Sequence, residues 1–324
     1  MKFILIKILK IFLRPFRHTL ISISKEFIEK EIFNSGLIIS NQNIKKFKKI
    51  DNLSDVEFST FSQWGDDGII DWLISNLKFK NKKFVEIGIQ DYWECNTRFL
   101  LKKRNWNGLI IDMSKDYIQK IKKQDIYWKY NLTAKQVKIS KGNINKILVD
   151  NNFSKNIGLL SLDIDSNDYW IIEAMNVSPD IIVCEYNGIF GDNYKLTVPY
   201  KKNFDRTKEH YSNLYYGCSI NALISLMFKK GFVFIGTNSA GNNAYFLKKK
   251  NFSIIKNKIR QKKIFLPKFR ESRGINNQKT FLSIEKSINL IKNKYVYDLS
   301  KKRLIKIKEL KNTLSQKQIV YFKN

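Results

Sequence analysis

The chain has 324 residues, of which 43% are hydrophobic, so it can bury the core of one large domain or of two small ones. Its 59 basic and 29 acidic side chains give a formal charge of +30, but the excess is mostly lysine in a chain rich in Ile and Asn, a composition that AT-rich coding sequences produce for almost any function. The charge is dispersed and no basic-aromatic platform stands out, which argues against nucleic acid as a partner. Three cysteines without a C-x-x-C pair or a nearby histidine argue against a disulfide framework and a zinc site, and favour a cytoplasmic protein.

Residues 1–20, MKFILIKILKIFLRPFRHTL, predict a basic amphipathic helix. Lys7, Lys10, Arg14 and Arg17 are spaced so that they share one stripe of a helix, opposite a mainly apolar side. These charges interrupt every apolar run, so no segment is long enough to span a bilayer. The helix either lies on an anionic membrane surface, which would place the protein on the inner membrane, or packs as a terminal helix with solvated lysines. We therefore predict a basic N-terminal arm over residues 1–55.

From residue 61 the chain alternates predicted helices and apolar strands, which indicates an α/β fold with a doubly wound, mostly parallel sheet. The predicted strands cover residues 83–88, 106–112, 126–130, 157–165 and 180–186. The predicted helices cover residues 65–77, 96–103, 117–123, 143–149, 169–175 and 219–230. Residues 231–249 then predict an antiparallel hairpin, because two apolar runs flank a turn rich in Gly, Asn and Ser. A parallel sheet finished by such a pair is the Rossmann-like order of class I methyltransferases, here over residues 56–250, and residues 251–324 are predicted to form a Lys-rich helical extension.

Acidic side chains stand at the ends of the predicted strands, where ligands bind in open α/β sheets. The first strand ends in Glu86-Ile87-Gly88 and the second ends at Asp112, where a carboxylate can accept both hydroxyls of a ribose. No G-x-G-x-x-G turn is present, which argues against a pyrophosphate ligand. S-Adenosylmethionine has no phosphate, and its cationic groups favour carboxylates, so these positions predict a site for it. The alternative is that the strand ends are acidic for no functional reason.

An ordered set of motifs over about residues 60–250 resembles the FkbM-type branch of S-adenosylmethionine-dependent methyltransferases. The motifs are FSQWGDDGIIDWL, FVEIGIQDYWECNTRFLL, GLIIDMS, LLSLDIDSNDYWIIEAM and IIVCEYNGIFG. The resemblance implies an enzyme that methylates a hydroxyl of a saccharide or glycolipid of bacterial surface polysaccharide. It implies that Glu86, Gly88 and Asp112 hold the cofactor, with Asn96 and Gln63 close by. Met113, next to Asp112, and Asp163, at the end of the fourth strand, are further candidate cofactor residues. The sequence departs from the family at Gln90-Asp91, where related enzymes carry smaller residues.

The run Asp163-Ile164-Asp165 allows three interpretations. The two carboxylates could bind Mg²⁺ in a metal-dependent sugar methyltransferase, bind metal and nucleotide sugar in a glycosyltransferase, or lie beside the methyl donor without a metal. Alternate residues of a strand point to opposite faces, so both carboxylates reach one metal only if the strand ends between them. Ser166 and Asn167 make such an ending plausible.

O-Methylation requires a base near the acceptor hydroxyl. His210 is the first candidate, because it lies in the polar and aromatic run RTKEHYSNLYYGCS, whereas His18 belongs to the basic arm. Asp165 and Glu185 are the other candidates, and the alternative for His210 is a hydrogen-bonded loop residue.

Residues 186–191, 198–200 and 238–243 combine aromatic and amide side chains, as saccharide sites do, although Asn and Gly also form ordinary turns. A non-enzymatic, basic, membrane-associated protein is the remaining alternative.

Overall fold

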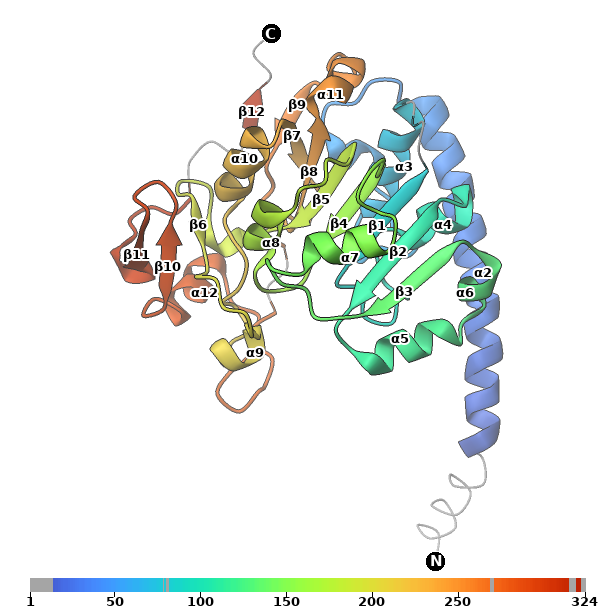
Figure 1. The fold of residues 1–324 in the computed structure, drawn as a ribbon, viewed down its shortest axis with the longest axis horizontal. Helices are drawn as coiled ribbons and strands as arrows, with labels where there is room; N and C mark the ends of the chain where they lie inside the picture. Colours follow the sequence, from blue (N-terminus) through green and yellow to red (C-terminus); the bar gives the residue numbers. More distant parts are fainter. Residues whose placement is uncertain (1–13, 78, 80–81, 269–270, 315–318, 322–324) are drawn as a thin grey trace, which may run out of the picture.

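The computed structural model describes residues 14–77, 79, 82–268, 271–314 and 319–321, and Figure 1 shows a central sheet flanked by helices. The sheet has seven strands in the order β3-β2-β1-β4-β5-β8-β7. All neighbours from β3 to β5 pair in parallel, while β8 lies antiparallel between β5 and β7. This is the strand order of the class I methyltransferase fold, so the predicted fold class is confirmed. The strands are β1 (Lys83–Ile87), β2 (Asn107–Asp112), β3 (Leu132–Gln136), β4 (Leu159–Leu162), β5 (Ile181–Glu185), β7 (Phe232–Thr237) and β8 (Asn243–Lys248).

Helices cover both faces of the sheet because its central strands are apolar on both sides. Phe84 of β1 packs into the core beneath the helices α3 and α4, whereas Val85 and Ile87 pack into the core beneath α7, α8 and α10. Alternate residues of a strand therefore supply two separate cores. The helices are α3 (Asp66–Asn76), α4 (Arg98–Arg104), α5 (Lys115–Lys122), α7 (Ile144–Asp150), α8 (Asp168–Ala174) and α10 (Ile220–Lys229), with the 3₁₀ turns η1 (Leu53–Val56), η2 (Gly188–Phe190) and η3 (Ile307–Glu309).

The prediction for the third strand is wrong. Residues 126–130 belong mainly to the short helix α6 (Asp125–Lys129), and the strand β3 begins only at Leu132. Trp128 is 72% exposed, and Lys129 forms an ion pair with Asp125 one helical turn earlier. β3 is an edge strand in which buried residues alternate with more exposed ones at its start, so it lacks the continuous apolar run of the central strands.

The predicted helical C-terminal extension is also wrong. In the part that the structure describes, the region beyond residue 250 contains two seven-residue α-helices, α11 (Lys249–Ile255) and α12 (Ile284–Leu290), together with the 3₁₀ turn η3, strands and loops. Burial alternates along β10 and β11, as in a strand: Val296 and Asp298 are buried on one, and Ile305 and the following Ile307 on the other. The added strands are β9 (Gln261–Lys263), β10 (Tyr295–Asp298), β11 (Arg303–Lys306) and β12 (Ile319–Tyr321).

A small second sheet joins this C-terminal region to a segment inserted before α10. β6 (Leu196–Thr197) pairs with β10, which pairs with β11, and the three strands lie to the left of the main sheet in Figure 1. Leu196, Val198 and Val296 share one apolar core. The same insertion carries the short helix α9 (Arg206–Glu209). The predicted boundary at residue 250 thus lies between regions that pack together, and it stays a prediction.

A 33-residue helix, α2 (Arg14–Lys46), lies along the side of the domain over its C-terminal part and extends beyond the domain toward its N-terminus (Figure 1). It is anchored by Glu29, which forms ion pairs with Arg98 at 2.8 Å and with Lys102 at 2.6 Å. The predicted membrane-binding stripe of residues 1–20 lies outside the residues whose side chains are described, so it stays a prediction. Within the described part of the chain, no helix combines the length and the apolar character needed to cross a bilayer.

Candidate active site

A cavity of about 570 Å³ lies at the carboxyl ends of β1, β2, β4 and β5, and this volume falls within the range of about 300–1,000 Å³ that is typical of small-molecule sites. The inserted segment and the stretch around Pro267 complete its walls. The structure brings most of the predicted site residues together here, whereas Glu86, Asn96 and His210 are not among the lining residues. Those that line the cavity are Gln63, Gly88, Asp112, Met113, Asp163, Asp165 and Glu185.

Gly88 forms the turn that ends β1, and no other residue fits there. Its φ of 85° lies in the left-handed region, and a Cβ atom would stand 1.5 Å from the carbonyl oxygen of Asp163. The amide of Gly88 donates to the carbonyl of Ile111 at 2.9 Å, and the amide of Asp163 donates to the carbonyl of Ile87 at 3.0 Å. The turns after β1, β2 and β4 are therefore held together, and the backbone at Gly88 is bare toward the cavity.

Asp112, the last residue of β2, has its carboxylate held by backbone amides. Oδ2 accepts from the amides of Ile89 at 3.2 Å and Gln90 at 2.9 Å, and Oδ1 accepts from the amide of Ser114 at 2.8 Å. An ionised carboxylate has about four acceptor sites, so Asp112 keeps capacity for a further donor. Beside it the cavity wall is apolar, with Val137 and Ile139 from the turn after β3.

Glu86 and Asn96 lie behind the cavity wall. The Glu86 carboxylate accepts from the amides of Asn96 at 2.7 Å and Thr97 at 3.0 Å and from the Thr97 hydroxyl, and its burial raises the pKa of Glu86 to about 7. The Asn96 side chain donates to the hydroxyl of Ser161 at 3.1 Å. Both residues thus fix the connection from β1 to α4, next to Gly88.

The FSQWGDD run contributes one lining residue, Gln63, and two structural aspartates. Oδ2 of Asp67 accepts from three successive backbone amides, those of residues 60–62, at 2.6–2.9 Å. Asp66 is fully buried and accepts from the side-chain amides of Asn238 and Asn243 and from the Tyr245 hydroxyl. These bonds tie the loop before α3 to the turn between β7 and β8.

Some of the segments predicted to contact a saccharide line the cavity, and others do not. The amide groups of Asn238 and Asn243 are engaged by Asp66, and that of Asn187 donates to the carbonyls of residues 214 and 216. Gly241 and Asn242 line the cavity, as do residues 186–189, whereas residues 198–200 do not. Only part of the predicted sugar-binding surface therefore faces the site.

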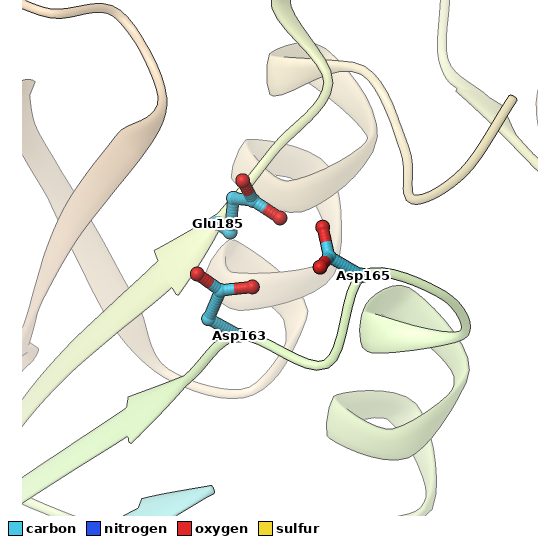
Figure 2. A group of neighbouring side chains, drawn as sticks. All are labelled: Asp163, Asp165 and Glu185. Atoms are coloured by element: carbon cyan, nitrogen blue, oxygen red, sulfur yellow. The ribbon is translucent and has the colours of Figure 1, made fainter. Parts of the chain in front are cut away.

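Three carboxylates converge on the opposite side of the cavity from Asp112. Figure 2 shows Asp163 and Asp165 from the turn after β4 and Glu185 from the end of β5, with carboxylate oxygens within 4.8 Å of one another. β4 ends at Leu162, so the pleat of a strand does not separate the two aspartates. Asp168 shapes this turn, because its buried carboxylate accepts from the amides of Ile164 at 2.9 Å and Ser166 at 3.0 Å.

Burial and the neighbouring acids make Asp163 and Glu185 bind protons more tightly than isolated carboxylates do. Burial raises the pKa of Asp163 and of Glu185 well above the usual range, and the nearby charges of Asp165 and Asp168 raise both further. Oε2 of Glu185 is buried and has no hydrogen-bond partner among the described residues. An acid with a raised pKa is a stronger base when it is ionised, so this group is chemically suited to proton abstraction.

Arg206, which the sequence analysis missed, supplies the cation of this cluster. It begins α9, forms an ion pair with Asp165, and stacks over the ring of Tyr216, 4.5 Å from the ring centre. The sequence held one signal for it, since a single arginine stands in the same polar run as His210. Nothing in the local pattern connects that arginine to an aspartate 41 positions earlier.

His210 lies outside the residues that line the cavity. Its Nδ1 is 2.7 Å from the hydroxyl oxygen of Ser212, and its ring lies against that of Tyr211. Burial and the charge of Lys294 lower the pKa of His210. The structure therefore gives it the contacts of a hydrogen-bonded loop residue, which was the alternative interpretation, and its catalytic role stays a prediction.

A scan against protein-family models and a search of curated proteins both return no match. Solved structures with a similar arrangement include the N-terminal domain of EvdMO1 with SAH bound, at 7% identity and a TM-score of 0.34 over 52% of this chain and 73% of that one. TehB from Haemophilus influenzae matches at 13% identity and a TM-score of 0.33, over 52% of this chain and 58% of TehB. PKMT2 from Rickettsia typhi matches at 12% identity and a TM-score of 0.34, over 54% of this chain and 51% of PKMT2. Such distant matches carry no argument about activity, and the fold class rests on the strand order itself.

Proposed function

We propose that this protein is an S-adenosylmethionine-dependent O-methyltransferase that acts on a saccharide or glycolipid of bacterial surface polysaccharide. The observation that supports the proposal is a single cavity at the carboxyl ends of the strands, in a sheet with the strand order of class I methyltransferases. The backbone of Gly88, the carboxylate of Asp112 and the acid cluster around Glu185 all line this cavity.

The residues on the β1 and β2 side fit this cofactor. Asp112 has acceptor capacity for a ribose hydroxyl, and the apolar groups of Met113 and Val137 form the adjoining wall. Gly88 lines the cavity and has no side chain, so a ligand can approach its backbone closely. When bound, S-adenosylmethionine supplies an electrophilic methyl group on a sulfonium centre. Asp163 and Gln63 are the nearby polar side chains that would face its charged end.

The residues on the β4 and β5 side suit the acceptor. In O-methylation the acceptor hydroxyl loses its proton, and Glu185 has a buried carboxylate oxygen without a partner in the described structure. Asp165 is less suited to this role, because its charge is already paired with Arg206. We therefore assign proton abstraction to Glu185, assisted by the neighbouring Asp163.

The outer wall of the cavity supports a carbohydrate acceptor. Phe204 and Tyr216 present rings to it, while Asn213 and Asn242 bring amide groups. Flat apolar faces combined with amide donors and acceptors match the faces and hydroxyls of sugar rings. The inferred class of acceptor rests on this mixture and on the resemblance of the motifs.

The experiment that tests the methyl-donor site is isothermal calorimetry with S-adenosylmethionine and S-adenosylhomocysteine. We expect micromolar binding by the wild type, a loss of at least about tenfold, or 1.4 kcal/mol, in Asp112→Ala, and no change in Asp116→Ala, whose carboxylate is 70% exposed on α5. Thermal melting of each variant checks that it folds. If the wild type fails to bind either ligand but binds a nucleotide sugar with manganese, the protein is a glycosyltransferase and the proposal is wrong.

The acceptor is then tested with a labelled methyl donor and isolated surface-glycan oligosaccharides and glycolipids. Label on a saccharide oxygen supports the proposal. Label only on peptide or nucleic acid substrates would overturn the class of acceptor and leave the donor site standing.

A further inference from the structure

We propose that Arg206 is the resident cation of the cluster formed by Asp163, Asp165 and Glu185, and that its guanidinium holds the position on Asp165 that a divalent metal ion would need. The inference goes beyond the proposed methyl transfer, because it concerns how this cluster is neutralised whatever reaction the cavity performs. It also decides between the metal-dependent and metal-independent interpretations of the Asp163-Ile164-Asp165 run.

The three acids of the cluster are of the type that binds a metal ion, but one of them, Asp165, is already paired with Arg206. Its three carboxylates offer oxygens within 4.8 Å of one another, and such hard oxygen ligands suit Mg²⁺ or Mn²⁺. Asp165, however, already forms a charge-assisted bond with Arg206. A metal ion that used the carboxylate oxygen of Asp165 that Arg206 holds would have to displace the guanidinium.

The structure holds Arg206 in place from several directions. Its guanidinium stacks on Tyr216, which also lines the cavity, and its side chain is only 21% exposed. Asp205 caps the start of α9 by accepting from the amide of Thr207 at 3.0 Å. Glu209, at the end of α9, is bonded to the side chain of Lys201 and lies 3.8 Å from that of Lys294. The cation is therefore pre-positioned by the insertion and is not a mobile surface arginine.

The aspartate is held from the other side. Asp165 has a φ of 54°, a left-handed conformation that few residues other than Gly, Asn and Asp adopt. Asp168 fixes the amides on both sides of it, and the amide of Gly217 donates to the carbonyl of Ser166 at 2.9 Å. The ion pair thus joins two hydrogen-bonded parts of the chain, the turn after β4 and the inserted segment with α9.

Because Arg206 and a metal ion would compete for one carboxylate, removing the arginine should create a metal site. The test is Mn²⁺ binding, followed by the paramagnetic resonance of free Mn²⁺ and by calorimetry on the full chain. We expect weak binding by the wild type and an affinity at least about tenfold higher in Arg206→Gln. Lys202→Gln is the matched control, since Lys202 is another cation that lines the cavity, and it should behave as the wild type does.

Two further variants test whether the positive charge of residue 206 and the carboxylate of Asp165 account for the change in Mn²⁺ affinity. Arg206→Lys keeps the positive charge and should bind Mn²⁺ as weakly as the wild type. Arg206→Gln combined with Asp165→Asn should lose the gained affinity, because the shared carboxylate is gone.

Two outcomes would overturn the proposal: wild-type protein that binds Mn²⁺ as tightly as Arg206→Gln, or an Arg206→Gln variant that gains no affinity while remaining folded. None of these measurements needs the methyl donor, so their failure is distinct from failure of the proposed methyl transfer.

Discussion

The carboxylates on the two sides of the cavity have different neighbours: backbone amides on one side and other acids on the other. On the β1 and β2 side, Asp112 is surrounded by backbone amides from the neighbouring turns, which solvate its charge. On the β4 and β5 side, Asp163 and Glu185 face each other and Asp165, and Arg206 from a distant insertion lowers the pKa of both. Amide donors make a carboxylate a stable hydrogen-bond acceptor, whereas crowding with other acids makes it a base. The comparison assigns binding to the first side and chemistry to the second.

The largest effect should come from breaking the first side at Gly88. Gly88→Ala places a Cβ atom 1.5 Å from a backbone oxygen and forces alanine into a left-handed conformation, so the turn must move. We expect a loss of S-adenosylmethionine affinity of about 100-fold or more, or about 2.7 kcal/mol, together with a lower melting temperature. Calorimetry and thermal melting measure both.

The matched control for this change is Gly142→Ala. No atom lies within 4 Å of the position where its Cβ would be built, so affinity and melting temperature should stay unchanged. Wild-type affinity in Gly88→Ala would show that the turn after β1 is not the cofactor cradle, and the division of the cavity into two sides would fail.

A second effect should separate chemistry from binding on the other side. Glu185→Gln removes the inferred base, and we expect kcat to fall by about 10²–10⁴-fold while the affinity for S-adenosylmethionine is kept. The control is Glu173→Gln on α8, where the carboxylate is 39% exposed and paired with Lys141. Parallel losses of affinity and kcat in Glu185→Gln would mean that the two sides are not separable.

The pH dependence of kcat sharpens the same point. A base acts only when it is deprotonated, and burial and neighbouring acids raise the pKa of Glu185. The rate should therefore be lost as the pH falls through a midpoint well above about 4.3, the ordinary value for glutamate. A midpoint at the ordinary value would contradict the crowding that distinguishes this side of the cavity.

The smallest effect is expected at His210. Because its ring bonds to Ser212 and lies outside the cavity lining, His210→Ala should leave kcat within about twofold and lower the free energy of unfolding by about 1 kcal/mol. Steady-state kinetics and denaturant unfolding measure these quantities. A drop in kcat as large as that of Glu185→Gln would make the histidine the base instead.

Much of the fold was predictable because it is encoded locally. The apolar runs around Val85, Leu109, Leu160 and Val183 are each buried on both faces of a parallel sheet, so composition alone identifies them as strands. The third strand was misplaced because it lies at the edge of the sheet, where burial alternates and the apolar run is lost. The C-terminal strands lack a strand signal in the sequence, because lysines separate their few buried residues, such as Val296 and Ile305.

By itself the sequence determined the order of the central strands and helices and the acidic strand ends, since these follow from spacing within a few residues. The need for glycine at position 88 comes from the turn after β4, whose Asp163 carbonyl oxygen would lie 1.5 Å from a Cβ atom. Only the tertiary structure decided which carboxylates face the cavity. In the folded protein, Glu86 accepts a hydrogen bond from the backbone of Thr97, His210 lies outside the cavity lining, and Arg206 forms an ion pair with Asp165. Those outcomes depend on contacts between residues far apart in the chain, and periodicity and composition carry no record of such contacts.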